Sequence, residues 1–249
     1  MAGFRAYFDF RGEVEDKYIY LSPSESRHLI AARRAKLGES VDVFNLDGIA
    51  FRTKLVEANA KRAKLELMEK IELETKVSKI ILGQAIPKAK TFDDILRQSI
   101  EIGIDGVFPI LSENCEVKIS AKDAPSKREK WQVQIVEAIK QSSNMGSFEF
   151  PLADNFEVFL EYAKDFDLKI IASLEEGSKA ILNCLRENVE SKETSVAILI
   201  GPEGDFSAKE YARAREAGFR AVTLGNQVMK AETAALSACA IVSNYILAI

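Results

Sequence analysis

A cation, a carboxylate and a hydroxyl lie within four residues near the end of the 249-residue chain, at Lys230, Glu232 and Thr233. Side chains of these types can stabilise a developing negative charge, take up a proton or order a bound ligand. An equally supported alternative gives Glu232 and Thr233 a structural role as the N-terminal cap of a final helix, where a carboxylate favours the positive end of the dipole. Their role therefore depends on what the neighbouring elements place beside them.

Two short apolar strands that end in glycine turns should position these candidates. Residues 196–200 are apolar throughout, which predicts a buried parallel strand, and a Gly-Pro-Glu-Gly turn follows at residues 201–204. A second strand at residues 221–224 ends at Gly225, and a capping box at Ser207 and Glu210 begins the helix between the two strands. Because ligands of open α/β sheets bind beyond the carboxyl ends of the strands, the two turns predict a ligand crevice.

The two turns exclude some ligands. They contain neither the Gly-Lys-Ser/Thr sequence of a phosphate-binding P-loop nor the GxGxxG sequence of a dinucleotide site. A nucleoside triphosphate or a dinucleotide is therefore not indicated. Taken alone, a Gly-Pro-Glu-Gly turn is more often structural than functional, and its pairing with Gly225 and the polar residues that follow is what favours a site.

The sequence around both turns resembles a known family. IGPEGDFSAKE at residues 200–210 and LGNQVMKAETAAL at residues 224–236 look like the C-terminal signature of the RsmE family, within the SPOUT superfamily of RNA methyltransferases. Further resemblance at residues 28–38, 82–104, 108–119 and 136–144 extends the match over nearly the whole chain. The resemblance implies an enzyme that uses S-adenosylmethionine to methylate N3 of a uridine in 16S ribosomal RNA of the small subunit.

The resemblance also implies the fold class and the domains. Residues 1–72 correspond to a small PUA-like RNA-binding β-barrel, and residues 73–249 to an α/β SPOUT methyltransferase domain with a mostly parallel sheet and a trefoil knot. The pattern of residues predicts strands at 5–10, 18–21, 40–45, 49–56 and 62–68, with a hairpin turn at Asp47-Gly48 and a charged linker at 70–78. Strands at 80–85, 107–111 and 169–173 then alternate with helices at 91–102, 126–141, 178–186 and 231–249.

Basic residues near the N-terminus are candidate RNA contacts. A helix predicted to start near Ser24 would place Arg27 and Arg34 on one compact face with His28 beside them, and the alternative is an ordinary solvated helix surface. The resemblance at residues 28–38 favours RNA. The RNA-binding candidates are Arg5, Arg27, His28, Arg33, Arg34, Lys36 and Lys88. For His28 we favour an RNA or packing contact over a role as catalytic base.

In SPOUT enzymes the loops of the knot hold the methyl donor, and the resemblance assigns the cofactor-binding residues on this basis. These are Leu174, Glu175, Ile200, Gly201, Pro202, Glu203, Gly204, Leu224, Gly225, Asn226, Val228 and Met229. The three glycines would let backbone amides and carbonyls approach the adenine and the ribose. Ile200, Leu224 and Met229 would flank the ring, and ordinary core filling is the alternative for Met229.

The implied reaction defines roles for the polar residues. Methyl transfer from a sulfonium is an in-line displacement, so positioning supplies much of the acceleration, and the proton on the uridine N3 must leave before or during attack. We assign Lys230 as the cation that stabilises charge on the uracil oxygens, with Glu232 and Thr233 ordering the loop or the substrate, while a carboxylate or water accepts the proton. Cys115 as a covalent nucleophile is the alternative, but N3 chemistry needs no covalent step, and a packed thiol is favoured.

Several basic groups of the family pattern are replaced. The replaced positions are Gln98, Asn114, Asn144 and Lys230, the last of which keeps the charge but loses the bidentate fork of arginine. Asp205 stands where the family has a second glycine. Each lost phosphate contact weakens RNA binding. Two rivals follow: a non-catalytic RNA-binding or ribosome-assembly protein, and a SPOUT methyltransferase with a different RNA target. The glycine turns, Glu232, Thr233 and Arg34 keep the family pattern and favour an active enzyme.

Composition limits which partners, cellular locations and metal sites the sequence allows. The net charge of −4 argues against indiscriminate binding of nucleic acid, and residues 1–72, with 13 basic and 12 acidic residues, are the favoured place for an RNA contact. The sequence has no apolar run of about 18 residues, so no membrane span is predicted, and it has no apolar signal-peptide core. Together with three cysteines that form no CxxC pair, this indicates a reduced, cytoplasmic protein. A single histidine disfavours a metal site. The resemblance further implies a homodimer through the apolar residues 231–249, and burial within one subunit is the alternative.

Overall fold

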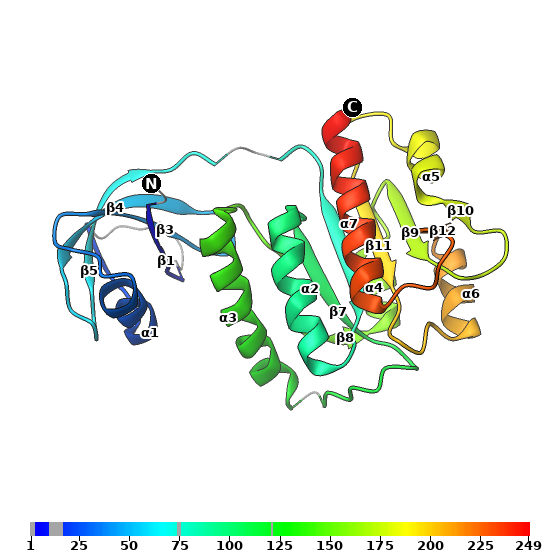
Figure 1. Ribbon diagram of the computed structural model, residues 1–249, viewed down its shortest axis with the longest axis horizontal. Helices are drawn as coiled ribbons and strands as arrows, with labels where there is room; N and C mark the ends of the chain where they lie inside the picture. Colours follow the sequence, from blue (N-terminus) through cyan, green and yellow to red (C-terminus); the bar gives the residue numbers. More distant parts are fainter. Residues whose placement is uncertain (1–2, 10–16, 74–75, 121) are drawn as a thin grey trace. The chain divides into compact units, whose positions relative to one another are not determined.

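The computed structural model describes residues 3–9, 17–73, 76–120 and 122–249, and the side chain of Ala89 is not described. The chain forms two compact units (Figure 1). The first contains Met1–Thr75 and Ile139–Phe148, and the second contains Lys76–Ala138 and Glu149–Ile249. The last residue of the strand predicted at 5–10 and part of the predicted linker at 70–78 lie outside the described residues.

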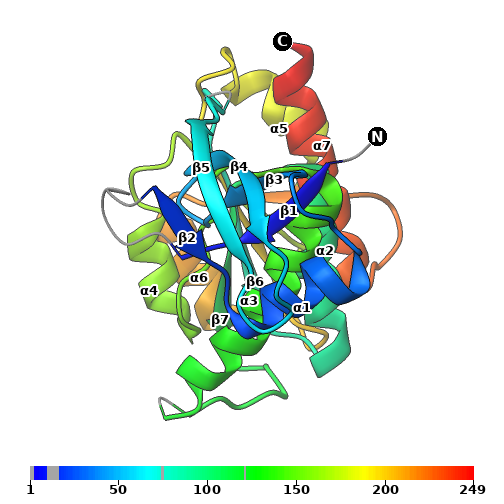
Figure 2. The same cartoon turned by 90° about the vertical axis from the view of Figure 1, so that its left-hand side faces the viewer.

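The N-terminal unit is built on a five-stranded sheet (Figure 2). The strands in spatial order are β1 (Phe4–Tyr7), β3 (Ser40–Phe44), β4 (Ala50–Glu57), β5 (Lys64–Lys70) and β2 (Tyr18–Tyr20). All neighbours are antiparallel except β1 and β3, and no ladder joins β1 to β2 within the described residues. Alternate residues such as Val41, Val43 and Leu55 are fully buried in one apolar cluster, so the predicted β-rich unit is confirmed.

The predicted hairpin at Asp47-Gly48 is confirmed. The Asn45 side-chain carbonyl accepts hydrogen bonds from the backbone N–H groups of Asp47 and Ile49, at 3.0 and 2.9 Å. Gly48 has a φ of 77°, which a residue with a Cβ adopts at a cost. Local side-chain chemistry and a glycine therefore close β3 onto β4.

The predicted basic helix is shorter than its pattern suggests. The helix α1 (Pro23–Arg27) continues only as a single π-helical turn, η1 (His28–Ala32), and Arg33 is its C-cap. Arg34 then turns the chain with a φ of 60°, and the N–H of Ala35 donates to the carbonyl of Leu29. Ala35 and Leu29 are both buried in the core of the unit. The prediction that Arg27 and Arg34 share a helical face is wrong, because burial of Ala35 ends the helix before Arg34.

The second unit is an α/β domain with a parallel seven-stranded sheet, as the sequence predicts (Figure 1). In spatial order the strands are β10 (Lys179–Ala180), β12 (Arg220–Thr223), β9 (Leu168–Ala172), β11 (Val196–Ile200), β6 (Ile80–Ala85), β7 (Gly106–Leu111) and β8 (Asp154–Asn155). The helices are α2 (Ala89–Ile102), α3 (Ala124–Ser142), α4 (Phe156–Tyr162), α5 (Ile181–Asn188), α6 (Ala208–Glu216) and α7 (Ala231–Ala248). The last residues of α3 belong to the first unit.

Helices cover both faces of the parallel sheet. On one face α7 packs against β6 and β11, beside α2 and α5. On the other face Phe159 of α4 and Tyr211 of α6 join an apolar cluster with strand residues such as Ala197 and Leu199. The strands are buried on both sides, which explains why residues 196–200 are apolar throughout.

Most element boundaries agree with the sequence pattern to within three residues. The left-handed Gly103 that ends α2, with a φ of 90°, and the capping box of Ser207 with Glu210 are confirmed. The helix expected at residue 178 begins instead at Ile181, after the two-residue strand β10. The helix α4 was not predicted because only seven residues form it, which is too short for a helical period to be recognised.

By length and composition the last helix, α7, is apolar enough to cross a membrane, although the sequence contains no uninterrupted apolar run of about 18 residues. Its stripe of Ala235, Ala238, Val242 and Ile246 is buried against the sheet and its neighbouring helices. The apolar character of this stripe is that of a helix in the core of a globular domain.

Candidate functional site

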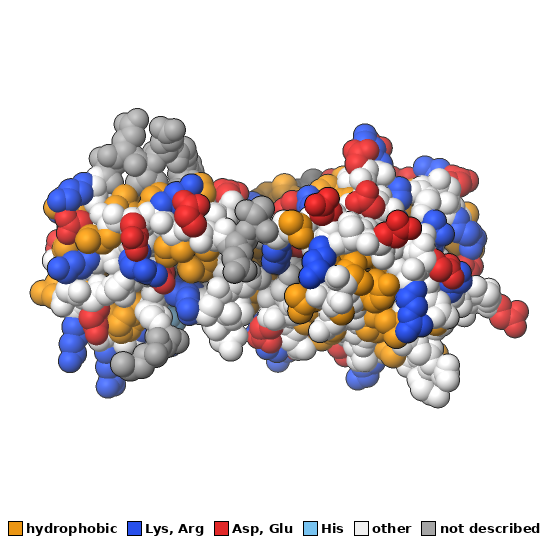
Figure 3. Space-filling model, turned by 90° about the horizontal axis from the view of Figure 1, so that it is seen from above, with side chains coloured by type: hydrophobic (Ala, Val, Ile, Leu, Met, Phe, Trp, Pro, Cys, Tyr) orange, Lys and Arg blue, Asp and Glu red, His pale blue; other side chains and the backbone are white. Residues whose placement is uncertain are grey.

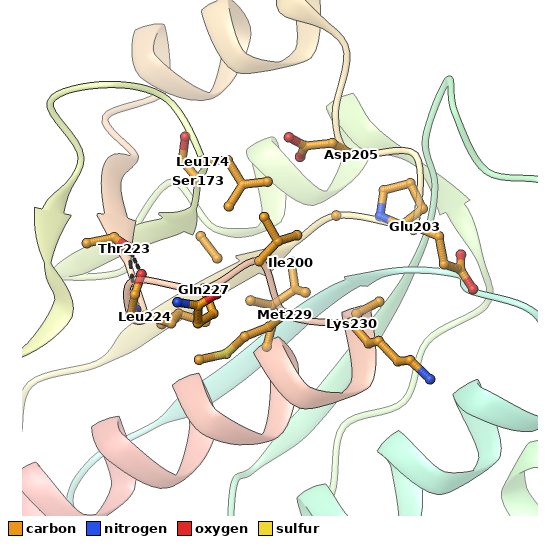
Figure 4. Close-up of a pocket in the computed structure, with 17 residues that line it drawn as sticks. Ser173, Leu174, Ile200, Glu203, Asp205, Thr223, Leu224, Gln227, Met229 and Lys230 are labelled. Carbon is orange, nitrogen blue, oxygen red and sulfur yellow. Dashed lines mark hydrogen bonds between the residues drawn. The ribbon is translucent and has the colours of Figure 1, made fainter.

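A cavity of about 340 Å³ lies at the carboxyl ends of β9, β11 and β12, in the C-terminal unit (Figure 4). Residues from three segments line it: 172–174 at the end of β9, 200–203 and 205 at the end of β11, and 223–225 and 227–231 at the end of β12, together with Ala234 of α7. Its volume falls within the range of about 300–1,000 Å³ that is usual for small-molecule sites. The crevice predicted from the two glycine turns is therefore present, with a third strand contributing.

Most of the predicted cofactor contacts line this cavity. They are Leu174, Ile200, Gly201, Pro202, Glu203, Leu224, Gly225, Val228 and Met229. Glu175 and Asn226 line an adjacent cavity instead, and Gly204 lines neither of the two. The carboxylate of Glu175 is also paired with Arg215 at 2.8 Å, so this side chain is already engaged.

Other lining residues were missed by the sequence analysis. These are Ala172, Ser173, Asp205, Thr223, Gln227, Ala231 and Ala234. Ser173 directly follows β9 and Thr223 ends β12, and a position at the carboxyl end of a parallel strand is the signal that could have identified them. Gln227 lies within a segment that was already assigned to the site.

The cavity has an apolar wall and a polar end. Leu224, Met229 and Ile200 supply the apolar side chains, while the side chains of Glu203 and Lys230 extend together at the end away from Thr223 (Figure 4). Exposed apolar side chains stand at the rim, with Val228 at 78% and Leu174 at 63% exposure. Such a site suits a ligand with a flat apolar ring and charged groups.

Contacts from distant segments hold the Gly-Pro-Glu-Gly turn in place. The amide of Asn114 donates to the carbonyls of Gly204 and Asp205, at 3.2 and 3.0 Å. A carboxylate oxygen of Glu203 accepts the backbone N–H of Lys88 at 3.2 Å. Asn114 stands where the family has arginine, and in this chain its side chain holds the turn rather than extending free toward a substrate.

Asp205, at the end of the same turn, has a strained backbone conformation. Its φ of 57° lies in the left-handed region, which glycine adopts without penalty. One carboxylate oxygen accepts the N–H of Phe206 and the hydroxyl of Tyr211, both at 2.8 Å. Burial raises the pKa of Tyr211 well above its ordinary value, with a further rise from the hydrogen bond to Asp205, so the hydroxyl stays protonated and donates. The hydrogen bonds explain how aspartate occupies a position suited to glycine.

The turn after β12 is closed by its own residues. The Thr223 hydroxyl donates to the Gly225 carbonyl at 2.9 Å and accepts the Gly225 N–H at 3.4 Å (Figure 4). A Cβ at Gly225 would stand 3.4 Å from the terminal methyl of Met229. Met229 therefore packs over the glycine and lines the cavity, which agrees better with a ligand-facing role than with simple core filling.

The three polar candidates near the C-terminus do not all reach the cavity. Lys230 lines the cavity as the N-cap residue of α7. Glu232 and Thr233 lie in the first turn of the helix and do not line it. The alternative that Glu232 or Thr233 caps the helix with its side chain is wrong, because the N-cap residue is Lys230 and α7 has no side-chain cap hydrogen bond. Glu232 still favours the positive end of the helix dipole.

The cysteines are packed thiols. Cys115 is 3% exposed within the apolar cluster of the C-terminal unit, where its sulfur contacts the Ser112 hydroxyl at 3.2 Å. This environment supports the packing role over the covalent nucleophile. Burial raises the pKa of Cys239 to about 12, so this thiol also stays protonated.

The predicted RNA contacts divide into exposed and engaged residues. Arg27, Arg33, Arg34 and Lys36 are exposed, and none of them has an ion pair within the described part of the chain. Arg5 is half-buried and donates to the backbone carbonyl of Lys140 at 3.1 Å, inside the first unit. Lys88 is paired with Glu116 at 3.1 Å. Among the predicted RNA contacts, the exposed basic groups without an ion pair in the described residues therefore lie in residues 27–36.

No group of three or more His, Cys, Asp or Glu side chains in the described ranges is arranged to hold a metal ion.

Comparisons with known proteins agree with this geometry. The profile of an RNA methyltransferase domain matches residues 73–243, and that of an RNA methyltransferase PUA domain matches residues 21–68. Ribosomal RNA small subunit methyltransferase E of Mesomycoplasma hyopneumoniae is 32% identical over 70% of this chain and 73% of its own. The Aquifex aeolicus protein of the same name is 29% identical over 94% and 97%.

Solved structures show the same arrangement. A putative methyltransferase from Legionella pneumophila, in complex with the bound cofactor SAM, has a TM-score of 0.83 and 27% identity, with 98% of each chain covered. Ribosomal RNA small subunit methyltransferase E from Neisseria gonorrhoeae, bound to S-adenosyl methionine, has a TM-score of 0.82 and 25% identity, also over 98% of each chain.

The parallel α/β domain with its cavity, preceded by a PUA domain, defines an RNA methyltransferase. More narrowly, the chain belongs to the ribosomal RNA small subunit methyltransferase E family. The resemblance found in the sequence is thereby confirmed.

Proposed function

We propose that the protein transfers a methyl group from S-adenosylmethionine to N3 of a uridine in 16S rRNA of the small ribosomal subunit. The observation that carries the proposal is the cavity formed by the ends of β9, β11 and β12, in a chain that belongs to this family. The bound cofactor named for the similar Legionella and Neisseria structures supports the choice of methyl donor.

The lining residues fit S-adenosylmethionine. Ile200, Leu224 and Met229 offer an apolar wall for the adenine, and Gly201 and Gly225 line the cavity without a Cβ, which lets a ligand approach the backbone closely. The carboxylates of Glu203 and Asp205 favour a positively charged ligand in the same cavity. When bound, the cofactor supplies an activated methyl group on its positively charged sulfur.

Lys230 is the residue that we propose to act on the uracil. Its ammonium group stands at the polar end of the cavity and can stabilise negative charge on a uracil oxygen as the N3 proton leaves. Glu232 and Thr233 act as positioning residues, which hold the first turn of α7 and the loop before it. A carboxylate or a water molecule takes the proton.

We further propose that Arg27, Arg33, Arg34 and Lys36, with His28, bind rRNA through the PUA domain, and that Arg5 and Lys88 contribute. The proposed active species is a cytoplasmic homodimer with the knotted SPOUT topology. Leu247 of α7 is 76% exposed, and apolar side chains gather on one face of the C-terminal unit (Figure 3), which supports a partner surface. Light scattering that shows only monomers at assay concentrations would contradict the dimer.

The test is methyl transfer itself. The purified protein is incubated with isotopically labelled S-adenosylmethionine and small subunits, free rRNA or tRNA, and the modified nucleoside is identified by mass spectrometry. N3-methyluridine in small subunits or free rRNA is the expected product. Transfer to another nucleoside or only to tRNA would contradict the proposed specificity, and cofactor binding without any transfer would favour an RNA-binding protein.

Variants of Lys230 test the assigned cation. Lys230→Ala is expected to lower kcat about 100-fold, the usual effect of removing one charge-stabilising donor, while Lys230→Arg keeps activity within about tenfold. Equal kcat values for the wild type and Lys230→Ala would remove Lys230 from the mechanism.

Glu232→Ala tests the positioning role. It is expected to abolish methylation while lowering the free energy of unfolding by no more than about 1 kcal/mol, because Glu232 makes no side-chain cap and contributes only its interaction with the helix dipole. Full activity of the variant would reduce Glu232 to its favourable interaction with the helix dipole.

A further inference from the structure

A second cavity of the C-terminal unit is not part of the cofactor site. Its volume is about 170 Å³, half that of the cofactor cavity. It lies between the start of α2, which contributes Phe92 and Asp93, and the face of α3 that carries Lys127, Lys130, Trp131 and Gln134. We call this site the Trp131 pocket. Its size suits a single aromatic heterocycle rather than a complete cofactor.

The Trp131 pocket has a rigid aromatic wall. The Trp131 ring packs edge-on against Phe92, with ring centroids 4.7 Å apart, and perpendicular to Phe150 at 6.0 Å. Trp131 is 7% exposed and is one of the residues that line the pocket. Because its neighbours hold the ring in one orientation, it offers a rigid apolar wall against which a planar ring can pack.

The charges around the Trp131 pocket favour a phosphate. Lys127 and Lys130 lie one helical turn apart on α3 and therefore project from the same side of the helix. Neither lysine is paired with a carboxylate within the described residues, in contrast to Lys88, which is bound to Glu116. Asp93 and Gln134 add an acceptor and an amide that can hydrogen-bond the edge of a base.

An ion pair and a hydrogen bond connect the loops of the Trp131 pocket to the cofactor cavity. Pro87 and Val117 line the pocket, and their chain neighbours Lys88 and Glu116 form an ion pair at 3.1 Å. The backbone N–H of Lys88 donates to Glu203, which lines the cofactor cavity. The two sites are thus neighbours that share one connected set of loops.

From these contacts we infer that the Trp131 pocket binds one nucleotide of the RNA substrate, next to the uridine that enters the methyl-transfer site. The base packs against the wall formed by Trp131, while Asp93 and Gln134 contact its edge, and Lys127 and Lys130 bind the flanking phosphates. This inference rests on the proposed function, because a pocket beside the methyl donor serves an RNA substrate that must be held while one base reacts.

The principal test removes the two phosphate contacts. The double variant Lys127→Ala/Lys130→Ala is compared with Lys192→Ala/Lys209→Ala, which removes two exposed lysines from elsewhere in the same unit. With small subunits or free 16S rRNA, the pocket variant is expected to raise KM about tenfold while kcat changes little. Binding of single-stranded RNA should lose about 1.4 from the slope of log K against log salt, at about 0.7 for each phosphate. The control variant should retain both values.

Trp131 provides an independent readout, because it is the single tryptophan of the chain. A uridine-containing hexanucleotide is expected to quench its fluorescence in the wild type and in the control variant, and to do so only at about tenfold higher concentration in the pocket variant. Equal quenching by uridine monophosphate at the same concentration would overturn the RNA assignment in favour of a free nucleotide. Equal KM, salt slope and quenching for the pocket and control variants would overturn the pocket itself.

The measurements distinguish a failure of the proposed function from a failure of the proposed RNA-binding role of the Trp131 pocket. Binding of S-adenosylmethionine, measured by calorimetry, should be the same for the wild type and both double variants, which also checks that the variants are folded. If no methyl group is transferred to any RNA, the proposed function fails, while the hexanucleotide still tests the pocket. If methyl transfer occurs and the two lysines have no effect on RNA binding, only the pocket is refuted.

Discussion

Substitutions of Asp205 test how the turn that follows β11 is held in its conformation. The residue is strained, with a φ of 57°, and its carboxylate accepts hydrogen bonds from Phe206 and from the buried Tyr211 hydroxyl. Three substitutions separate these effects. Asn keeps an acceptor and tolerates the left-handed region, Gly removes the acceptor and the strain together, and Ala removes the acceptor but keeps the strain.

The expected magnitudes follow from these contacts. Asp205→Ala should cost about 2–4 kcal/mol of unfolding free energy, because a charge-assisted hydrogen bond is lost and a buried hydroxyl is left without its main acceptor. Asp205→Gly should cost about 1 kcal/mol less than Ala, since the left-handed conformation penalises a Cβ by about 1–2 kcal/mol and the flexibility of glycine offsets part of that gain. Asp205→Asn should cost less than about 1 kcal/mol.

Urea unfolding followed by the fluorescence of Trp131 measures these differences, because this single tryptophan lies in the same unit as Asp205. Asp165→Ala, at an exposed aspartate of the same unit, is the matched control and should change the midpoint little. The expected order of stability is wild type, Asn, Gly, Ala. An Ala variant as stable as the Gly variant would refute the strain argument, and a Gly variant as stable as the wild type would refute the role of the hydrogen bonds.

Three further predictions concern the scaffold. Gly83→Ala should destabilise the C-terminal unit by about 1–3 kcal/mol in urea unfolding, because the added Cβ would stand 2.3 Å from an aromatic ring of α4; a neutral effect would show that this helix shifts freely. Lys140→Met should cost about 3–5 kcal/mol, because it leaves Glu25 unpaired in a buried ion pair of 2.7 Å, and adding Glu25→Leu should recover part of the loss; additive losses would contradict a direct coupling. Hydrogen bonds from Ser195 hold the pKa of Asp167 below its ordinary value, so this contribution to stability is present above the unfolded pKa of about 3.9 and is lost as pH falls through the folded value. The stability difference between wild type and Ser195→Ala should accordingly be constant above about pH 5 and shrink below it, and a difference that grows in acid would reverse the sign of the argument.

Local sequence patterns were reliable where neighbouring residues decide the structure. The Asp47-Gly48 hairpin, the glycine that ends α2 and the capping box of Ser207 with Glu210 all form as expected. Each depends on a backbone conformation or a hydrogen bond spanning only a few residues. The helix expected through Arg34 fails for the opposite reason, since burial of Ala35 in the core overrides a helical pattern of basic residues.

The strand-turn pattern at residues 196–204 and 221–225 determined by itself that a ligand crevice would form and that Lys230 would stand near it. A run of apolar residues is satisfied only by burial on both faces of a parallel sheet, and glycine turns then fall at one edge. Only the tertiary structure decided that Ser173 joins the same cavity and that Asn114 holds its turn. These contacts join residues about 30 to 90 positions apart, which no local propensity encodes. They depend on which strands lie side by side and on how the helices cover them.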